Sequence, residues 1–171
     1  MCRPIFWRPG YDTEIPVVRP GNSSLYRFGN SACKPGFQEY HYHDGNKTIS
    51  TCLSFGAPKV YYWVALRLCS EQNAFLASAK TLDKLALLVQ LAQGNLLWVG
   101  LDDRNENKVF VWVEDGTVIS PEKMEELFVP GEPNHGREQD CVAVKPPDTK
   151  MRDVVCANSK MFYFCETKPG C

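Results

Sequence analysis

Eight cysteines are the feature of this 171-residue chain that most restricts its fold. None of them forms a C-x-x-C pair, the spacing typical of zinc sites, so we expect disulfide bonds and not a metal cluster. Disulfides persist in oxidising compartments, which predicts a secreted or extracellular protein. Two glycosylation sequons, at Asn22 and Asn46, support this interpretation. Spacing alone does not select one pairing among the many that eight cysteines allow.

Length and charge exclude several classes of partner. The chain is long enough to bury a core, and one domain is the default for this length. Its 19 basic and 20 acidic residues nearly balance, and it has no basic stripe to neutralise phosphates, so we expect no nucleic-acid partner. No apolar run is long enough to cross a bilayer, so we expect no membrane span in this chain.

The chain divides into three regions. Residues 1–31 are rich in proline, glycine and arginine, which predicts turns and extended segments. We interpret them as an N-terminal extension that either lies against the domain or forms a partly ordered tail. Residues 32–168 carry the alternation of apolar and polar segments expected of a folded domain, and residues 169–171 form a tail with Cys171.

The first half of the domain predicts a hairpin followed by two helices. Asp44-Gly45 is a strong turn signal between strand-like segments at 37–43 and 48–55. Residues 61–69 are helix-like, with Trp63 on the apolar face, and Thr81 is a good N-cap for a helix over 82–92. Beyond these helices we expect strands and loops, with residues 120–129 forming either one helical turn or an open loop. The predicted class is α+β.

Several short motifs follow in a fixed order: Trp98-Val99-Gly100-Leu101, Trp112-Val113-Glu114-Asp115-Gly116, Glu132-Pro133-Asn134, Asp153-Val154-Val155-Cys156 and Phe164-Cys165. In the identity and order of these motifs, the residues from Cys33 to Glu166 resemble the C-type lectin-like domain. The resemblance implies two helices, antiparallel sheets and a long ligand-binding loop, held together by disulfides.

The resemblance also implies three disulfide bonds: Cys33–Cys52, Cys69–Cys165 and Cys141–Cys156. The last of these would fix the base of the long loop. Cys2 and Cys171 remain, and they pair either with each other or between two chains in a disulfide-linked dimer. We favour the pairing within one chain because the termini of a domain often lie close together.

In sugar-binding members of this family, a calcium ion lies in the long loop and two neighbouring sugar hydroxyls coordinate it. Calcium takes about six to eight oxygen ligands. The Glu-Pro-Asn version of the motif is associated with mannose, glucose and fucose, and a cis peptide before its proline aims both side chains at one point. The resemblance therefore implies a carbohydrate- and calcium-binding site whose candidate ligands are Glu132, Asn134, Glu138 and Asp153.

The sequence departs from the family pattern in two places, so the calcium site is incomplete. Gln139 stands where an acid is usual, with Glu138 beside it as a substitute. Arg152 replaces the asparagine that precedes Asp153, and an arginine offers no oxygen and adds a positive charge. We expect Arg152 to modulate the site, either by extending into solvent or by pairing with the site's carboxylates in place of calcium.

A second calcium position and an active site are not expected. Asp103 and Asp140 fit the auxiliary calcium position of some relatives, but Asn107 and His135 stand where acids are usual. No Ser/His/Asp or Cys/His arrangement suggests catalysis, and every cysteine is expected to be in a bridge. We therefore predict no catalytic residues.

Two functions agree with the sequence. The first is a secreted or extracellular lectin that binds glycans or glycoproteins, with calcium and with a preference for mannose, glucose or fucose. The second is a calcium-independent domain that recognises a protein partner or another ligand, which Arg152 and Gln139 favour. Both a free protein and one part of a larger receptor are compatible with the sequence.

Overall fold

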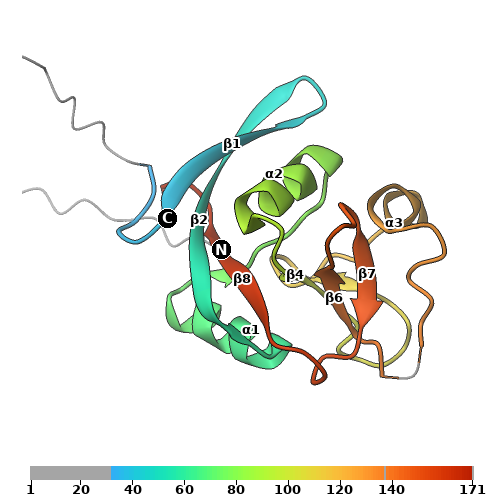
Figure 1. Cartoon of the computed structure of the whole chain (residues 1–171). Coiled ribbons are helices and arrows are strands. Elements are labelled where there is room, and N and C mark those ends of the chain that lie inside the picture. Colours follow the sequence, from blue (N-terminus) through green and yellow to red (C-terminus); the bar gives the residue numbers. More distant parts are fainter. Residues whose placement is uncertain (1–31, 137, 171) are drawn as a thin grey trace, which may run out of the picture.

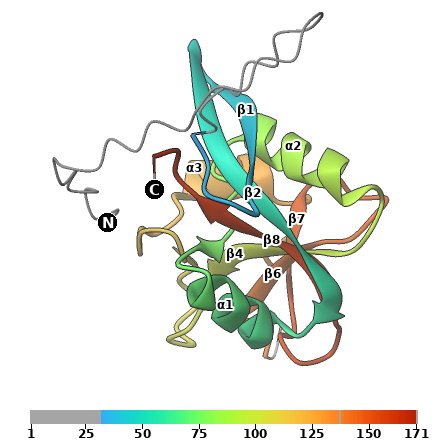
Figure 2. The ribbon, with the colours of Figure 1, turned by 90° about the vertical axis from the view of Figure 1, so that its left-hand side faces the viewer.

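The computed structural model describes residues 32–136 and 138–170, which form a twisted sheet with helices packed against it (Figure 1 and Figure 2). The predictions for residues 1–31 and Cys171, including glycosylation at Asn22 and the pairing of Cys2, lie outside the described residues. The elements are β1 (Gln38–Asp44), β2 (Lys47–Val60), α1 (Tyr62–Glu71), β3 (Phe75–Leu76), α2 (Leu82–Ala92), β4 (Leu97–Asp102), β5 (Val111–Trp112), α3 (Pro121–Leu127), β6 (Cys141–Val144), β7 (Met151–Val154) and β8 (Met161–Thr167).

The sheet has the strand order β1-β2-β8-β4-β6-β7, with β3 added to β8 and β5 added to β4. All strand pairs are antiparallel except β4 and β8, which meet in parallel at Leu97 and Phe162. The last strand of the domain therefore lies between the opening hairpin and the strands that carry the long loop. The predicted α+β class is confirmed.

The hairpin forms as its sequence predicts. β1 and β2 pair from Gln38 opposite Leu53 to Asp44 opposite Lys47, which leaves a two-residue turn. Gly45 occupies this turn with φ of +59°, a conformation that glycine adopts without steric cost. Asn46 is the other turn residue and is exposed, so its sequon is accessible, and glycosylation there stays a prediction.

Strand β4 separates two hydrophobic clusters. Because side chains alternate along a strand, Leu97, Val99 and Leu101 point to the cluster that α2 and α3 cover, and Trp98 points to the cluster that α1 covers. Gly100 lies in this strand because an added Cβ would come within 2.0 Å of the Leu76 carbonyl oxygen. The Trp-Val-Gly-Leu motif is thus the central strand of the core.

Helix α1 buries a different face from the one expected. Tyr62, Ala65 and Cys69 are fully buried, whereas the Trp63 side chain is 47% exposed. The prediction that Trp63 lies on the buried face is wrong because the apolar residues of α1 fit two overlapping helical stripes. Packing against Trp98 selects the stripe of Tyr62, whose ring centroid lies 5.3 Å from that of Trp98.

Helix α2 begins at the predicted cap. The Thr81 hydroxyl accepts a hydrogen bond from the Lys84 amide at 3.1 Å. Leu85, Leu88 and Ala92 are buried as a stripe, and Leu82 is exposed.

A buried ion pair fastens α2 to the sheet. The Lys84 ammonium, 3% exposed as a residue, pairs with the Glu166 carboxylate of β8. Glu166 also accepts hydrogen bonds from the Thr51 hydroxyl at 2.6 Å and the Ser78 amide at 3.0 Å. The carboxylate is therefore bonded to three separate elements of the fold, and the lysine ammonium lies 5.3 Å from the centroid of the Tyr42 ring.

A third helix, α3, precedes the long loop. The expectation of only two helices is wrong, because Pro121–Leu127 are helical where one turn or an open loop was predicted. Ser120 caps this helix by accepting a hydrogen bond from the Lys123 amide at 3.2 Å, and Pro121 stands at its first position. A serine cap followed by proline is an ordinary signal for the start of a helix, so α3 could have been predicted from the sequence.

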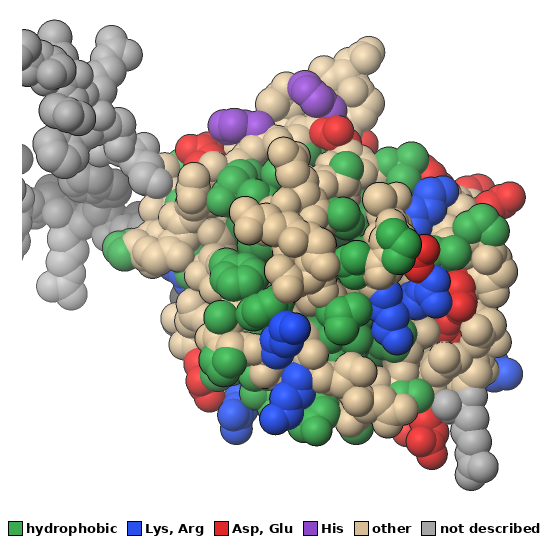
Figure 3. Space-filling view, viewed as in Figure 1, with side chains coloured by type: hydrophobic (Ala, Val, Ile, Leu, Met, Phe, Trp, Pro, Cys, Tyr) green, Lys and Arg blue, Asp and Glu red, His purple; other side chains and the backbone are tan. Residues whose placement is uncertain are grey.

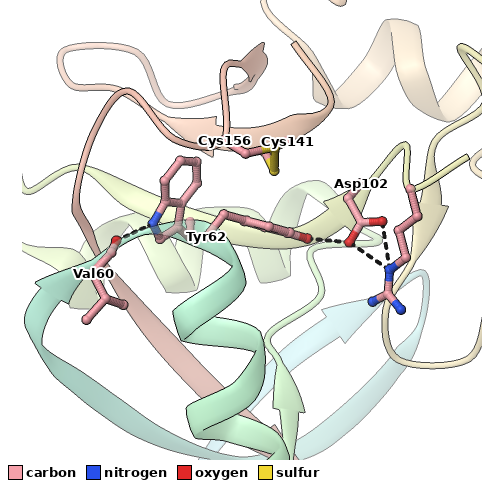
Figure 4. The surroundings of a disulfide bond; sticks show 7 residues. Val60, Tyr62, Asp102, Cys141 and Cys156 are labelled. Atoms are coloured by element: carbon pink, nitrogen blue, oxygen red, sulfur yellow. Dashed lines mark hydrogen bonds and ion pairs between the residues drawn. A yellow bond between two sulfur atoms is a disulfide. The ribbon is translucent and has the colours of Figure 1, made fainter. Parts of the chain in front are cut away.

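The three disulfide bonds implied by the resemblance are present: Cys33–Cys52, Cys69–Cys165 and Cys141–Cys156. Figure 4 shows Cys141–Cys156 above Tyr62, whose hydroxyl donates to the Asp102 carboxylate at 2.8 Å. Burial, followed by the Asp102 charge, raises the pKa of Tyr62 well above its usual value. The disulfide at the base of the long loop therefore belongs to the same buried cluster as Tyr62, whose hydroxyl is hydrogen-bonded to Asp102.

Candidate functional site

The long loop runs from α3 to β6 and is fixed to β7 at its start. The Val129 amide donates to the Met151 carbonyl at 2.9 Å, and the Glu132 amide donates to the Val129 carbonyl at 2.9 Å. The Glu132–Pro133 peptide is cis. This anchoring sets the Glu-Pro-Asn motif directly beside Asp153, a residue of β7 that is 1% exposed.

Glu132, Asn134 and Asp153 converge on one point of the loop. The Asn134 amide donates to Glu132 Oε2 at 3.0 Å and to Asp153 Oδ1 at 3.1 Å, and Asn134 Nδ2 donates to Glu132 Oε1 at 3.2 Å. The His135 amide donates to Asp153 Oδ2 at 2.7 Å. Backbone N–H groups thus orient both carboxylates and leave lone pairs on their oxygens.

The neighbouring Asp153 carboxylate affects the protonation of Glu132. Burial raises the pKa of Glu132, and so do a hydrogen bond to the Asp153 carboxyl and the charge of Asp153. Two acidic groups at this separation disfavour double ionisation, and a cation between them would remove that penalty. The geometry therefore concentrates negative charge where the Glu-Pro-Asn motif meets β7.

Glu138 lies apart from this cluster. It lines a pocket of about 490 Å³ together with Asp103, Glu106 and Asp140. Burial raises the pKa of Asp140, and the charges of Asp103, Glu106 and Glu138 raise it further. The structure thus brings together three of the four candidate ligands and places Glu138 with the acids of the neighbouring loop.

The acids around Glu138 line an open hollow, and one of them is engaged by the backbone. Asp103 accepts hydrogen bonds from the backbone amides of Asn107 and Lys108, so its carboxylate closes the loop 103–108. Within residues 32–136 and 138–170, no group of three or more His, Cys, Asp or Glu side chains is arranged to hold a metal ion. The pocket is an acidic hollow next to the candidate site.

Arg152 adopts an arrangement that the sequence did not predict. Its guanidinium pairs with the Asp148 carboxylate in the turn between β6 and β7, and both side chains are 30% exposed. It therefore neither extends freely into solvent nor pairs with Glu132, Glu138 or Asp153. Its charge still acts on the site, because it lowers the pKa of Glu132 against the effect of burial.

The donor set fits a calcium ion in part. Glu132, Asn134 and Asp153 supply carboxylate and amide oxygens, the ligands that calcium prefers, but a site needs about six to eight oxygens. Gln139 Oε1 is buried without a hydrogen-bond partner among the described residues, and it lies near Asn134 Oδ1 across Gly136, so it is a further oxygen that fits the set. The remaining ligands would be water or ligand hydroxyls.

Sequence reasoning missed a second hollow on the other side of Glu132. It measures about 380 Å³ and is lined mainly by apolar groups of α3 and the loop, including Met124, Val129 and Pro133. The missed helix α3 forms one wall of it. The sequence signal that could have predicted this helix is Ser120-Pro121, a helix cap followed by a proline at the first helical position.

Comparison with known proteins identifies the class of this domain. Residues 58–167 match the family model described as the Lectin C-type domain. This match covers more than half of the chain, so the chain belongs to the C-type lectin domain family. The match includes α1 through β8, and with them the Glu-Pro-Asn loop and β7.

Curated relatives are similar over most of the chain but are longer. The chain is 28% identical to mouse C-type lectin domain family 4 member F, over 71% of this chain and 22% of that protein. It is 27% identical to human C-type lectin domain family 4 member K, over 86% and 43%. It is 26% identical to the chicken mannose-binding protein, over 58% and 37%. The chain thus spans less than half the length of these relatives.

Solved structures share the fold. The cow carbohydrate-recognition domain of CD23, solved in the presence of an oligosaccharide, has a TM-score of 0.64 at 22% identity over 82% of this chain and 99% of its own. A calcium-independent type II antifreeze protein has a TM-score of 0.62 at 18% identity over 80% and 94%.

None of the helices that the structure describes is long and apolar enough to cross a membrane.

Proposed function

We propose that this domain is an extracellular carbohydrate-binding lectin that recognises a hexose through the long loop, with calcium held by Glu132, Asn134 and Asp153. The convergence of these three side chains carries the proposal. The Glu-Pro-Asn motif, with its cis peptide, supports a ligand of the mannose, glucose or fucose type on glycans or glycoproteins.

Each residue of the cluster has a separate task in this proposal. Calcium, when bound, supplies the charge that attracts a pair of neighbouring hydroxyls. Glu132 accepts a hydrogen bond from one hydroxyl, and the Asn134 amide donates to the other. Asp153 is buried and receives two backbone N–H groups, so it fixes the loop over β7. The 380 Å³ hollow beside Glu132 gives room for the sugar ring.

The test compares wild type with the double variant Glu132→Gln/Asn134→Asp. We expect wild type to bind a mannose-type glycan with calcium and not with chelator, and the double variant to shift toward galactose-type sugars because donor and acceptor exchange places. Glu122→Gln/Asn158→Asp is the matched control, since both residues are exposed and outside the loop. Equal glycan binding by wild type and the loop variant would exclude this site.

A second candidate is calcium-independent recognition of a protein or other ligand. The Arg152–Asp148 pair favours it, because a fixed guanidinium next to Glu132 opposes a divalent ion. A thermal melt with and without calcium separates the candidates. Saturation at about 100 times Kd should add about 2.7 kcal/mol of stability. If wild type shows no shift and Arg152→Asn shows one, Arg152 prevents calcium binding and the calcium-dependent function is excluded.

A further inference from the structure

Two lysines and two aromatic residues form a compact group on the β2–β8 pair, away from the long loop. Val60 of β2 pairs with Met161 of β8 in antiparallel register. Lys59 and Tyr61 flank Val60 at the end of β2, and Lys160 and Phe162 flank Met161 at the start of β8, so the four side chains lie close together beside this pair. We call these four residues and Phe55 the lysine–aromatic patch.

Two contacts between a lysine and an aromatic ring hold the patch together. Lys59 Nζ lies 5.1 Å from the centroid of the Phe162 ring, and Lys160 Nζ lies 5.2 Å from that of Tyr61. Each pair has the geometry of a cation–π contact. The Phe55 ring extends the patch, with its centroid 5.1 Å from that of Phe162. The Phe55 and Phe162 rings are thus in contact, and each of the two lysine–aromatic pairs carries one positive charge.

The patch is exposed and its charge is not neutralised within the described chain. Phe55 is 51% exposed and Tyr61 41%. Neither Lys59 nor Lys160 is in any ion pair formed by residues 32–136 and 138–170. Figure 3 shows exposed hydrophobic side chains over the centre of the molecule, with lysine and arginine side chains beside them. Exposed aromatic groups of this kind mark binding sites.

We propose that the lysine–aromatic patch binds an anionic saccharide, a sugar chain that carries sulfate or carboxylate groups. The two ammonium groups bind the anionic substituents, and the aromatic rings cover the apolar C–H face of a sugar ring. The two ammonium groups lie over different rings, so they contact different substituents of the chain. This site needs no calcium and does not depend on the function proposed for the long loop.

Three other occupants fit the patch less well. A specific protein interface uses about 20–30 residues a side, many more than the five side chains of the patch. Anionic membranes are recognised by clusters of about four to eight basic residues, and two lysines fall short of this. A second copy of the chain in a two-fold contact would bring the patch against itself and set lysine near lysine. A short anionic chain matches both the size and the charge.

The experiment measures binding of a heparin tetrasaccharide to the whole chain by calorimetry, in chelator and at low salt. Wild type should bind and should lose affinity as salt rises, because the ion pairs are exposed. Lys59→Glu/Lys160→Glu should weaken binding at least about tenfold, since two exposed ion pairs are lost and repulsion replaces them. Tyr61→Ala should also weaken it, and the Tyr61 side chain makes no cap hydrogen bond to α1 in the described structure, so the fold is retained.

The matched control is Lys47→Glu/Lys108→Glu, which makes the same change of charge at two exposed lysines outside the patch. It should keep wild-type affinity, and if it weakens binding as much as the patch variant, the effect is one of net charge and the proposal is wrong. Absence of tetrasaccharide binding by wild type would also overturn it. So would binding of an octaglutamate peptide, but not the tetrasaccharide, at Lys59 and Lys160, which would identify an acidic peptide as the occupant. A calcium-dependent glycan result at the long loop leaves this outcome unaffected.

Discussion

At the scale of single residues, the charged groups of this domain differ in how firmly the fold holds them. Lys84 and Glu166 are buried and bonded to each other, whereas Lys123 and Glu126 form a partly exposed pair one turn apart on α3. Exposed ion pairs contribute about 0–1 kcal/mol, and breaking a buried one leaves a charge without its partner. Burial therefore decides which lysine the fold depends on.

Replacement of Lys84 by Met should destabilise the domain by about 3–5 kcal/mol, because the buried Glu166 carboxylate loses its counter-charge. Adding Glu166→Gln should recover part of this loss, since the amide carries no charge and its oxygen still accepts from Thr51. Chemical denaturation with guanidinium measures both effects. Lys123→Met is the control and should cost about 1 kcal/mol or less. A loss of similar size in both lysine variants would contradict the role given to burial.

Ionisation of the Tyr42 hydroxyl should lower the stability of the domain at alkaline pH. Burial, followed by the charges of Glu166, Glu114 and Asp44, raises the pKa of Tyr42 to about 12. In the unfolded chain a tyrosine has a pKa of about 10. The fold therefore favours the neutral phenol, and this contribution is fully present below about pH 10 and is lost as pH rises toward about 12.

Tyr42→Phe should consequently lose less stability than wild type between about pH 10 and 12. Urea denaturation at a series of pH values measures the difference between the two proteins. Both should show the same dependence near neutral pH, where the phenol does not ionise. If the stabilities of the two proteins fall in parallel through the alkaline range, the fold does not raise the pKa of Tyr42 and this prediction is wrong.

At the scale of elements, the caps of the helices are local and testable. Thr81→Ala should lower the free energy of unfolding by about 1 kcal/mol, since the Lys84 amide loses its acceptor. Thr81→Ser should keep most of the stability, because serine offers the same oxygen. Thermal or chemical unfolding of the two variants is the measurement. If Ser and Ala at this position are equally destabilising, the threonine methyl group matters and the cap does not.

Sequence reasoning predicted the elements whose signals are local. The turn at Asp44-Gly45 and the cap at Thr81 depend on neighbouring residues, and both are confirmed. The burial of Lys84 was beyond this reasoning because its partner, Glu166, is 82 positions away.

In the candidate site the same limit separates Glu132 from Glu138. Glu132 and Asn134 are two positions apart in the motif and project in the same direction. Glu138 adopts φ of +64° and lines the hollow beside the 103–108 loop instead. A left-handed residue in a polar loop leaves no periodic signal in the sequence. The position of Arg152 was missed for a related reason, because its partner Asp148 lies in the loop between β6 and β7 and no sequence signal pairs the two.

At the scale of the whole molecule, the disulfides close loops of very different length. Cys69 and Cys165 are 96 positions apart, whereas the separations are 19 for Cys33–Cys52 and 15 for Cys141–Cys156. Chain entropy gives about 4.7 kcal/mol of stabilisation for a loop of about 100 residues and about 3 kcal/mol for a loop of about 15 residues. The bond from α1 to β8 should therefore stabilise the fold most.

Three double Cys→Ala variants, one for each bond, test this order. We expect the variant without Cys69–Cys165 to have the lowest free energy of unfolding, by about 1.5 kcal/mol relative to the other two. The Cys141–Cys156 variant should in addition change ligand binding by the long loop, because that bond fixes its base. Equal losses in all three variants would mean that loop length does not control their contribution.

The two ends of the described domain meet, and this decides how the domain carries mechanical load. The Gly170 amide donates to the Ala32 carbonyl at 2.7 Å, Cys33 is bonded to Cys52, and Cys52 pairs with Thr167 across β2 and β8 (Figure 2). A pulling force applied at residues 32 and 170 is taken up by this short covalent and hydrogen-bonded path. The long loop lies outside that path, so tension on a tethered domain would leave the arrangement of Glu132 and Asp153 undisturbed.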